Sequence, residues 1–143
     1  AAGGLAVCRR SAPAAAAGGG PPDCLLLDVT GELKLWYQLA SAAFIGKSLT
    51  ARGGQNPVEA IHAGVPVVCG PQMQNFDALM KSLDRAGAVI RVGGADGIES
   101  AFRRLLANPD ERRRLSAAAS RALAEHDGAT ARTLDVLDAL AGG

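Results

Sequence analysis

The chain has 143 residues, a formal net charge of +1 and 48% hydrophobic side chains, a composition typical of one soluble globular domain. Its near-neutral charge excludes strong electrostatic attraction to nucleic acid, and no apolar run reaches the roughly 18–20 residues of a membrane-spanning helix. The three cysteines, Cys8, Cys24 and Cys69, lie in or beside apolar runs. We therefore expect buried thiols in a reducing compartment, not disulfides or a metal site.

Apolar runs and helical periodicities alternate along the chain and are separated by short Gly- or Pro-containing connections. Residues 24–29 (CLLLDV) form a continuous apolar run, typical of a strand buried on both faces of a parallel sheet. Residues 11–23 are rich in Ala, Gly and Pro and predict a loop. The predicted elements are strands over 5–10, 24–29, 42–48, 65–71 and 88–93, and helices over 30–41, 56–64, 75–87, 95–107, 108–126 and 129–140.

This alternation predicts an α/β fold of right-handed βαβ units around a parallel, doubly wound, Rossmann-like sheet. Five strands are fewer than the six of the usual Rossmann plan, so we expect that a first βα unit is missing from this chain. In such sheets ligands bind at the carboxyl ends of the strands. The loops there are 28–32 (DVTGE), 46–57 (GKSLTARGGQNP) and 69–76 (CGPQMQNF), all rich in glycine and small polar residues.

The second of these loops leads into a helix through Gly53, Gly54 and the sequence Asn-Pro-Val-Glu, residues 56–59. Asn56 is expected as the N-cap, Pro57 as the first helical residue and Glu59 as the acid of a capping box. The same residues also suit a nucleotide. Glycines permit close backbone approach, the helix start favours a phosphate, and Glu59 can accept hydrogen bonds from ribose hydroxyls.

A purely structural interpretation is also open, because the chain repeats Asn-Pro-x-Glu at 108–111, where it is expected only to cap a helix. Gly31 and Glu32 likewise either begin the helix over 30–41 or contact the base or ribose of a nucleotide. Neither histidine has a second ligand at metal-binding spacing, so no metal site and no cofactor is expected.

Residues 28–76 resemble the C-terminal half of the 3-deoxy-D-manno-octulosonic acid (Kdo) transferases. The matching motifs, in order, are an acidic strand end, Gly-Glu-Leu, Gly-x-Ser-Leu, Gly-Gly-Gln-Asn-Pro-x-Glu, Pro-Val, Gly-Pro and Asn-Phe. The resemblance implies a GT-B glycosyltransferase with two Rossmann-like domains. Residues 1–143 would be its C-terminal nucleotide-sugar-binding domain, and the N-terminal acceptor domain would lie outside this chain.

The activity implied by the resemblance is inverting, metal-independent transfer of Kdo from CMP-Kdo to the lipid A precursor in lipopolysaccharide biosynthesis. It would take place on the cytoplasmic face of the bacterial inner membrane, with membrane association through the missing domain. The general base would also belong to that domain, so no catalytic residue is expected here and the chain alone should be inactive.

By matching position, the resemblance implies that CMP contacts Thr30, Gly31, Glu32, Asn56, Pro57, Val58 and Glu59. We further expect Lys47 and Ser48 to lie near the departing phosphate. The chain departs from the family where Lys47 replaces a common Gly, and where Gln55 and Gln72 replace common His residues.

Two alternatives stay open from the sequence. One is the donor domain of another GT-B enzyme that uses a UDP- or GDP-sugar. The other is a non-catalytic α/β module whose loops only cap helices and whose C-terminal helices bind a partner.

Overall fold

The structure, a computed structural model, describes residues 4–12 and 21–141, and the side chains of the last helix as far as His126. The chain divides into two compact units, Ala1–Trp36 and Tyr37–Gly143. Most of the predicted loop over 11–23 lies outside the described residues. No helix among the described residues is both long and apolar enough to cross a bilayer.

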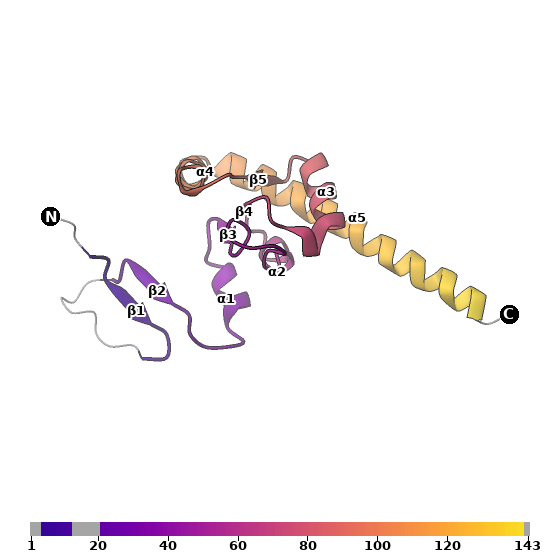
Figure 1. Cartoon of the computed structure of the whole chain (residues 1–143), viewed down its shortest axis with the longest axis horizontal. Helices are drawn as coiled ribbons and strands as arrows, with labels where there is room; N and C mark the ends of the chain where they lie inside the picture. Colours follow the sequence, from indigo (N-terminus) through magenta and orange to yellow (C-terminus); the bar gives the residue numbers. More distant parts are fainter. Residues whose placement is uncertain (1–3, 13–20, 142–143) are drawn as a thin grey trace. The chain divides into compact units, whose positions relative to one another are not determined.

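The first unit contains two parallel strands, β1 (Val7–Arg9) and β2 (Cys24–Leu26), drawn side by side in Figure 1. Both predicted strands therefore form, in shorter spans. The prediction that the second is buried on both faces is wrong, because Cys24 and Leu26 are exposed. An apolar run becomes buried only where other layers cover it, and no described element covers both faces of β2.

The helix predicted over 30–41 is reduced to α1 (Leu33–Tyr37). Gly31 has φ +87°, which a right-handed helix cannot contain. The carbonyl of Glu32 accepts the first turn's hydrogen bonds from Leu35 and Trp36, so the helix begins after Glu32 and not at Thr30 or Gly31. Leu33, the first residue of α1, is exposed.

The second unit has a three-stranded parallel sheet in the order β3 (Ala43–Ile45), β4 (Val67–Cys69) and β5 (Val89–Arg91). The five strands thus lie in two parallel sheets and not in the single sheet expected from the sequence. The α/β class with parallel strands is confirmed.

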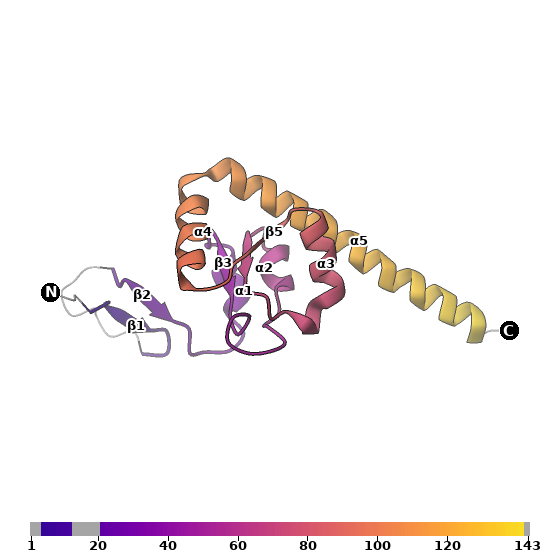
Figure 2. The same cartoon turned by 45° about the horizontal axis from the view of Figure 1, so that its top comes forward.

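The helices that follow these strands cover both faces of the second sheet, as a doubly wound arrangement requires. They are α2 (Val58–His62), the 3-10 turn η1 (Gln74–Phe76) with α3 (Asp77–Arg85), α4 (Ala95–Ala107) and α5 (Pro109–Ala141). Figure 2 shows α4 on one side of the sheet and α2 and α3 on the other. The two helices predicted over 108–126 and 129–140 are one continuous helix, α5.

Alternate strand residues point to different cores, which follows from the two-residue period of a strand. Ile45, Val67 and Cys69 pack with α2, α3 and one part of α5. Val68 packs instead with Ala101 and Leu105 of α4 and Leu115 of α5, and the partly buried Phe44 and Ile90 join them. The central strand β4 is therefore buried on both faces, as predicted for residues 65–71.

The predicted ending of α2 at Gly64 is confirmed. Gly64 has φ +73°, its backbone N–H donates to the carbonyl of Ile61 at 2.9 Å, and Val65 N–H donates to the carbonyl of Ala60 at 2.9 Å. This is the Schellman arrangement, which satisfies the last carbonyls of a helix. Val65 and Ala60 are both buried, so this helix end also contributes to the core.

The cysteine expectation holds for only one residue. Cys69 is buried in β4, and burial raises the pKa of its thiol. Cys8 is half-buried and Cys24 is exposed. The prediction of burial at these two positions is wrong, since both belong to the thinly covered sheet of the first unit.

Candidate functional site

The carboxyl edge of the second sheet brings together the two loops that the sequence singled out in this unit. The residues after β3 and those after β4 are joined by three hydrogen bonds: Gly70 N–H to Ser48 Oγ at 2.8 Å, Gln72 N–H to the Ser48 carbonyl at 2.9 Å, and Gly53 N–H to Gln74 Oε1 at 3.0 Å. The sheet therefore continues into a joined loop pair, from which Asn56–Glu59 lead directly into α2.

Gly53 and Gly54 have φ of +103° and +60°, backbone conformations that glycine adopts more readily than other residues. Their close approach is to their own chain and not to a ligand. A Cβ on Gly53 would lie 2.6 Å from Asn75 Nδ2, and one on Gly54 would overlap the Met73 sulfur and lie 3.0 Å from the Gln72 carbonyl. Both glycines are buried, so the expectation of backbone approach to a ligand at these two residues is wrong.

Asn56 Oδ1 accepts the Val58 N–H at 2.9 Å and so forms a turn just before α2. The N-cap residue is the buried Pro57, without a side-chain cap bond, so the prediction of Asn56 as N-cap and Pro57 as first helical residue is wrong by one position. The capping box is not formed, because among the described residues the Glu59 carboxylate accepts no hydrogen bond. Glu59 is exposed at this helix start, and its backbone N–H has no partner there either.

The second Asn-Pro-x-Glu sequence behaves differently. Asn108 Oδ1 accepts the N–H of Glu111 at 3.0 Å, which confirms the predicted cap of α5. The Glu111 side chain is only 17% exposed and forms an ion pair with Arg104 at 3.2 Å. Glu111 is thus used within the fold, whereas Glu59 has no ion-pair partner among the residues that the structure describes.

Tyr37 is an aromatic residue close enough to Glu59 for the charge of the glutamate to act on its phenol group. Burial, followed by the negative charge of Glu59, raises the pKa of the Tyr37 phenol. Tyr37 and Val58 both pack against the same core. The first turn of α2 therefore has an aromatic neighbour that the sequence did not connect to it.

Ser48 is buried in the fold, whereas the neighbouring Lys47 is exposed. Ser48 is 0% exposed, and its hydroxyl donates to the Ile45 carbonyl at 2.6 Å while accepting the Gly70 N–H. Its one proton is therefore used inside the fold and is not available to a departing phosphate, while the nearness of Ser48 to that phosphate stays a prediction. Lys47 is exposed, with φ +67°, a left-handed conformation that glycine adopts more readily than lysine.

The first unit holds the other predicted nucleotide residues. Thr30 and Gly31 are exposed after β2, and the half-buried Glu32 forms a two-bond ion pair with Arg10, with Nε–Oε2 at 2.9 Å and Nη2–Oε1 at 3.1 Å. This bond from Arg10 lowers the pKa of the Glu32 carboxyl group. Trp36 Nε1 also donates to Glu32, at 3.4 Å.

Arg10 and Ser11 were missed by sequence reasoning, although Arg10 ends the strand predicted over 5–10 and Ser11 directly follows it. Ser11 donates to Asp28 through its N–H at 2.9 Å and its hydroxyl at 2.6 Å, and the hydroxyl bond lowers the pKa of Asp28. The rule that functional residues gather at carboxyl strand ends would have found them. Their partners Asp28 and Glu32 follow the second strand, 17 and 22 residues away, and could not be predicted from a local pattern.

The structure therefore groups the seven predicted residues into two sets. Thr30, Gly31 and Glu32 form one set in the first unit, and Asn56–Glu59 form the other in the second. That both sets bind one nucleotide stays a prediction.

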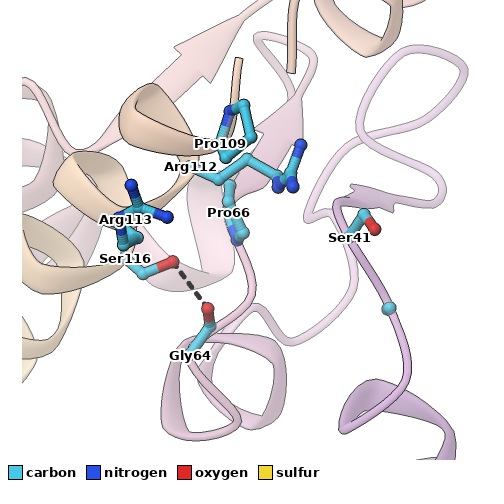
Figure 3. A pocket seen from close by; sticks show the side chains of 8 residues that line it. Ser41, Gly64, Pro66, Pro109, Arg112, Arg113 and Ser116 are labelled. Atoms are coloured by element: carbon cyan, nitrogen blue, oxygen red, sulfur yellow. Dashed lines mark hydrogen bonds between the residues drawn. The ribbon is translucent and has the colours of Figure 1, made fainter. Parts of the chain in front are cut away.

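Three of the cavities lined by described residues of the second unit adjoin its sheet or α2. One of about 470 Å³ lies at the carboxyl edge, lined by Pro71, Arg91 and Gly93 among others. A second of about 200 Å³ lies between Val58, Phe76 and His126. The third, of about 290 Å³, lies at the opposite edge of the sheet, where Ser116 of α5 donates to the Gly64 carbonyl at 2.5 Å (Figure 3). Among the described residues, no three acidic, His or Cys side chains gather as metal ligands.

Arg91 lines the first of these cavities, and its guanidinium group donates hydrogen bonds through Nε, Nη1 and Nη2. Nε and Nη2 donate to Asp84 at 3.0 and 2.8 Å, and Nη1 donates to the Gly70 carbonyl at 3.0 Å. The Asp84 bond raises the pKa of Arg91. Arg91 therefore holds α3 and the end of β4 against β5.

Residues 24–122 match the sequence profile of the family described as glycosyl transferases group 1. The 3-deoxy-D-manno-octulosonic acid transferase of Bordetella pertussis is 41% identical over 137 residues, which cover 96% of this chain and 32% of that protein. The enzyme of the same name from Haemophilus influenzae is 38% identical over 114 residues, covering 79% and 27%. The chain spans about a third of the length of these relatives.

A solved structure has the same fold. The C-terminal CMP-Kdo binding domain of WaaA from Acinetobacter baumannii superposes with a TM-score of 0.73 and 31% sequence identity, over 83% of this chain and 61% of that one.

Proposed function

The chain belongs to the glycosyl transferases group 1 family, and from this membership we propose that it is the CMP-Kdo-binding part of a Kdo transferase. The likeness to two curated Kdo transferases and to a CMP-Kdo binding domain supports this donor. The whole enzyme would transfer Kdo to the lipid A precursor. Residues 1–143 would serve as its C-terminal nucleotide-sugar domain, and a first βα unit and the acceptor domain would lie outside them.

The observation that carries the proposal is the state of Glu59. It is exposed at the carboxyl edge of a parallel sheet, where α/β proteins bind ligands. Unlike Glu111 in the equivalent position of α5, it has no ion-pair partner among the described residues. A carboxylate that the fold does not use can accept hydrogen bonds from two ribose hydroxyls.

We assign the other contacts by the same reasoning. The free N–H of Glu59 donates to the phosphate, while Asn56 holds the turn by occupying the Val58 N–H. Pro57 and Val58 contribute to the surface of the site but supply no N–H donor, because proline has none and the Val58 N–H already binds Asn56. Because α2 has only five residues, its dipole is small, and the site depends on these local groups.

The resemblance also assigns nucleotide contacts to Thr30, Gly31 and Glu32, all of them in the first unit. The Glu32 carboxylate is held by Arg10, so backbone groups of Thr30 and Gly31 make the contact to the base or ribose. Arg10 neutralises Glu32 and removes a negative charge that would otherwise repel the donor.

In the reaction, the acceptor hydroxyl loses its proton to a base outside this chain and attacks the anomeric carbon of Kdo, with inversion, as CMP departs. Negative charge grows on the departing phosphate and is stabilised by fixed donors. Lys47 and the Glu59 N–H are the groups of this chain that supply them. Membrane association and the acceptor site belong to the other domain, at the cytoplasmic face of the inner membrane.

Calorimetry on the full-length gene product tests the donor. CMP should bind, and UDP and GDP should bind at least about tenfold more weakly, a difference of roughly 1.4 kcal/mol. Tighter binding of UDP or GDP would assign the chain to a glycosyltransferase with a different donor. Absence of heat with all three nucleotides would reject nucleotide binding and favour a non-catalytic module.

A further inference from the structure

Ser48 is the only buried polar side chain among the residues that the structure describes, with 0% of it exposed. Its hydroxyl donates to the Ile45 carbonyl at 2.6 Å and accepts the Gly70 N–H at 2.8 Å. One donor and one acceptor function of the hydroxyl are thus both used inside the protein. Such a residue cannot touch a ligand, but it can fix the groups that do.

The position of Ser48 relative to the sheet shows what it fixes. The β3–β4 ladder ends with the pair Ile45 and Cys69. Just beyond this end, Ser48 forms the next hydrogen bonds between the two segments. Its side-chain hydroxyl accepts the Gly70 N–H, and its backbone carbonyl accepts the Gln72 N–H at 2.9 Å. Two further cross-links therefore extend the contact between the loops past the last strand residues.

Gly70 shows how close this contact is. A Cβ on Gly70 would overlap the Ser48 carbonyl oxygen and would lie 2.7 Å from the Leu49 Cδ2 atom. Gly70 is itself buried. Without the Ser48 hydroxyl, its N–H would be left without a partner in a place that water cannot reach.

The loop after β3 connects Ser48 to Asn56 and Glu59, which are proposed to bind the nucleotide. Its two ends meet where the Gln55 N–H donates to the Gly46 carbonyl at 3.2 Å, and Asn56 follows at once. Gly53 adds the bond to Gln74. A closed loop held at Ser48, Gly53 and its own base moves as one body, so its anchor determines where Asn56 and Glu59 lie.

We propose that Ser48 is a positioning residue for nucleotide binding, a role that rests on the proposed function. It acts through the loop, by holding the start of α2 at a fixed place beside the residues after β4. It makes no contact with the nucleotide.

The test is CMP calorimetry on the full-length gene product with Ser48→Ala and a matched control, Ser116→Ala. Ser116 also donates a hydroxyl hydrogen bond to a backbone carbonyl, that of Gly64, but at the opposite edge of the sheet (Figure 3). Ser48→Ala should weaken CMP binding about tenfold, roughly 1.4 kcal/mol, and should speed hydrogen exchange at the Gly70 amide. Ser116→Ala should leave CMP affinity within about twofold, roughly 0.4 kcal/mol.

Ser48→Cys provides a second variant of nearly equal size, because a thiol is a weak donor and acceptor. Its CMP affinity should lie between those of wild type and Ser48→Ala, and it decides the question if the alanine variant does not fold. Wild-type affinity in the folded Ser48 variants, or equal losses in Ser48→Ala and Ser116→Ala, would overturn the positioning role alone. Failure of the wild type to bind CMP would instead overturn the proposed function, and this inference with it.

Discussion

The side-chain oxygen of Asn56 lies 2.9 Å from the backbone nitrogen of Val58, whereas that of Asn108 lies 3.0 Å from the nitrogen of Glu111. The asparagine of the same Asn-Pro-x-Glu sequence therefore binds different N–H groups at the two helix starts. Before α5, Asn108 binds the N–H of the glutamate itself, and that glutamate pairs with Arg104. Before α2, Asn56 binds the N–H of Val58, one residue earlier, and Glu59 is exposed.

Replacing Glu59 with Gln should weaken CMP binding in the full-length protein by about tenfold, roughly 1.4 kcal/mol. The amide keeps the size of the side chain but loses the charge that accepts two hydroxyl bonds. Stability should change by less than about 0.5 kcal/mol, the range usual for exposed positions. Calorimetry and thermal unfolding measure the two effects.

Glu111→Gln is the matched control for that change, because it alters the equivalent position of α5. It should leave CMP affinity unchanged and lower stability slightly through the lost Arg104 ion pair. Equal CMP affinity in Glu59→Gln and wild type would show that Glu59 is only a surface residue.

Lys47→Gly should stabilise the protein by roughly 0.5–1 kcal/mol. A left-handed conformation costs a side-chain-bearing residue about 1–2 kcal/mol, and glycine's greater backbone freedom offsets part of the gain. Lys47→Ala keeps φ near +67° and should show no such gain. Thermal unfolding of the two variants compares them, and an equal rise in both would mean that the side chain, not the backbone, is responsible.

In the transfer reaction, Lys47→Ala should lower turnover, because it removes a positive charge assigned to the departing phosphate. Lys47→Arg keeps the charge and should retain most of the activity. Steady-state rates with CMP-Kdo measure this, and unchanged turnover in the alanine variant would remove Lys47 from the mechanism.

Gly54→Ala should destabilise the protein more than Gly64→Ala, by roughly 1–3 kcal/mol. Both glycines have positive φ, +60° and +73°, so both substitutions carry the same conformational cost. Only at Gly54 would the new methyl group meet other atoms, the Met73 sulfur and the Gln72 carbonyl, whereas nothing lies within 4 Å at Gly64. Denaturant unfolding of the pair isolates the packing contribution, and equal losses would contradict it.

Arg10→Ala should raise the pKa of Glu32 toward its ordinary value of 4.5, because the bond from Arg10 is the main cause of its lowered pKa. Since the folded pKa is the lower one, the stabilisation from this pair is present above pH 4.5 and is lost as the pH falls through the folded pKa. Carboxyl NMR titration of Glu32 measures the shift. The control, Arg9→Ala, removes a neighbouring charge that does not contact Glu32 and should leave this pKa in place.

Local patterns in the sequence predicted most elements of the second unit, although two predicted helices form the single helix α5. Apolar runs predicted β3, β4 and β5, and Gly64 and Asn108 predicted where α2 ends and α5 begins. These predictions succeeded because caps and turns depend on residues within about four positions of one another. The resemblance on residues 28–76 likewise indicated the family, since ordered motifs over that length are specific.

The use of each side chain was decided by tertiary structure. Ser48 is buried because Gly70, 22 residues later, lies beside it, and Glu32 is held by Arg10, 22 residues earlier. The glycine pair faces Met73 and Asn75 and not a ligand. Strand pairing and register bring such residues together, and neither is contained in a local window. Local sequence patterns therefore predicted most of the elements, the cap of α5 and the family, whereas the tertiary contacts determined which polar groups are used within the fold and which, like Glu59, stay exposed.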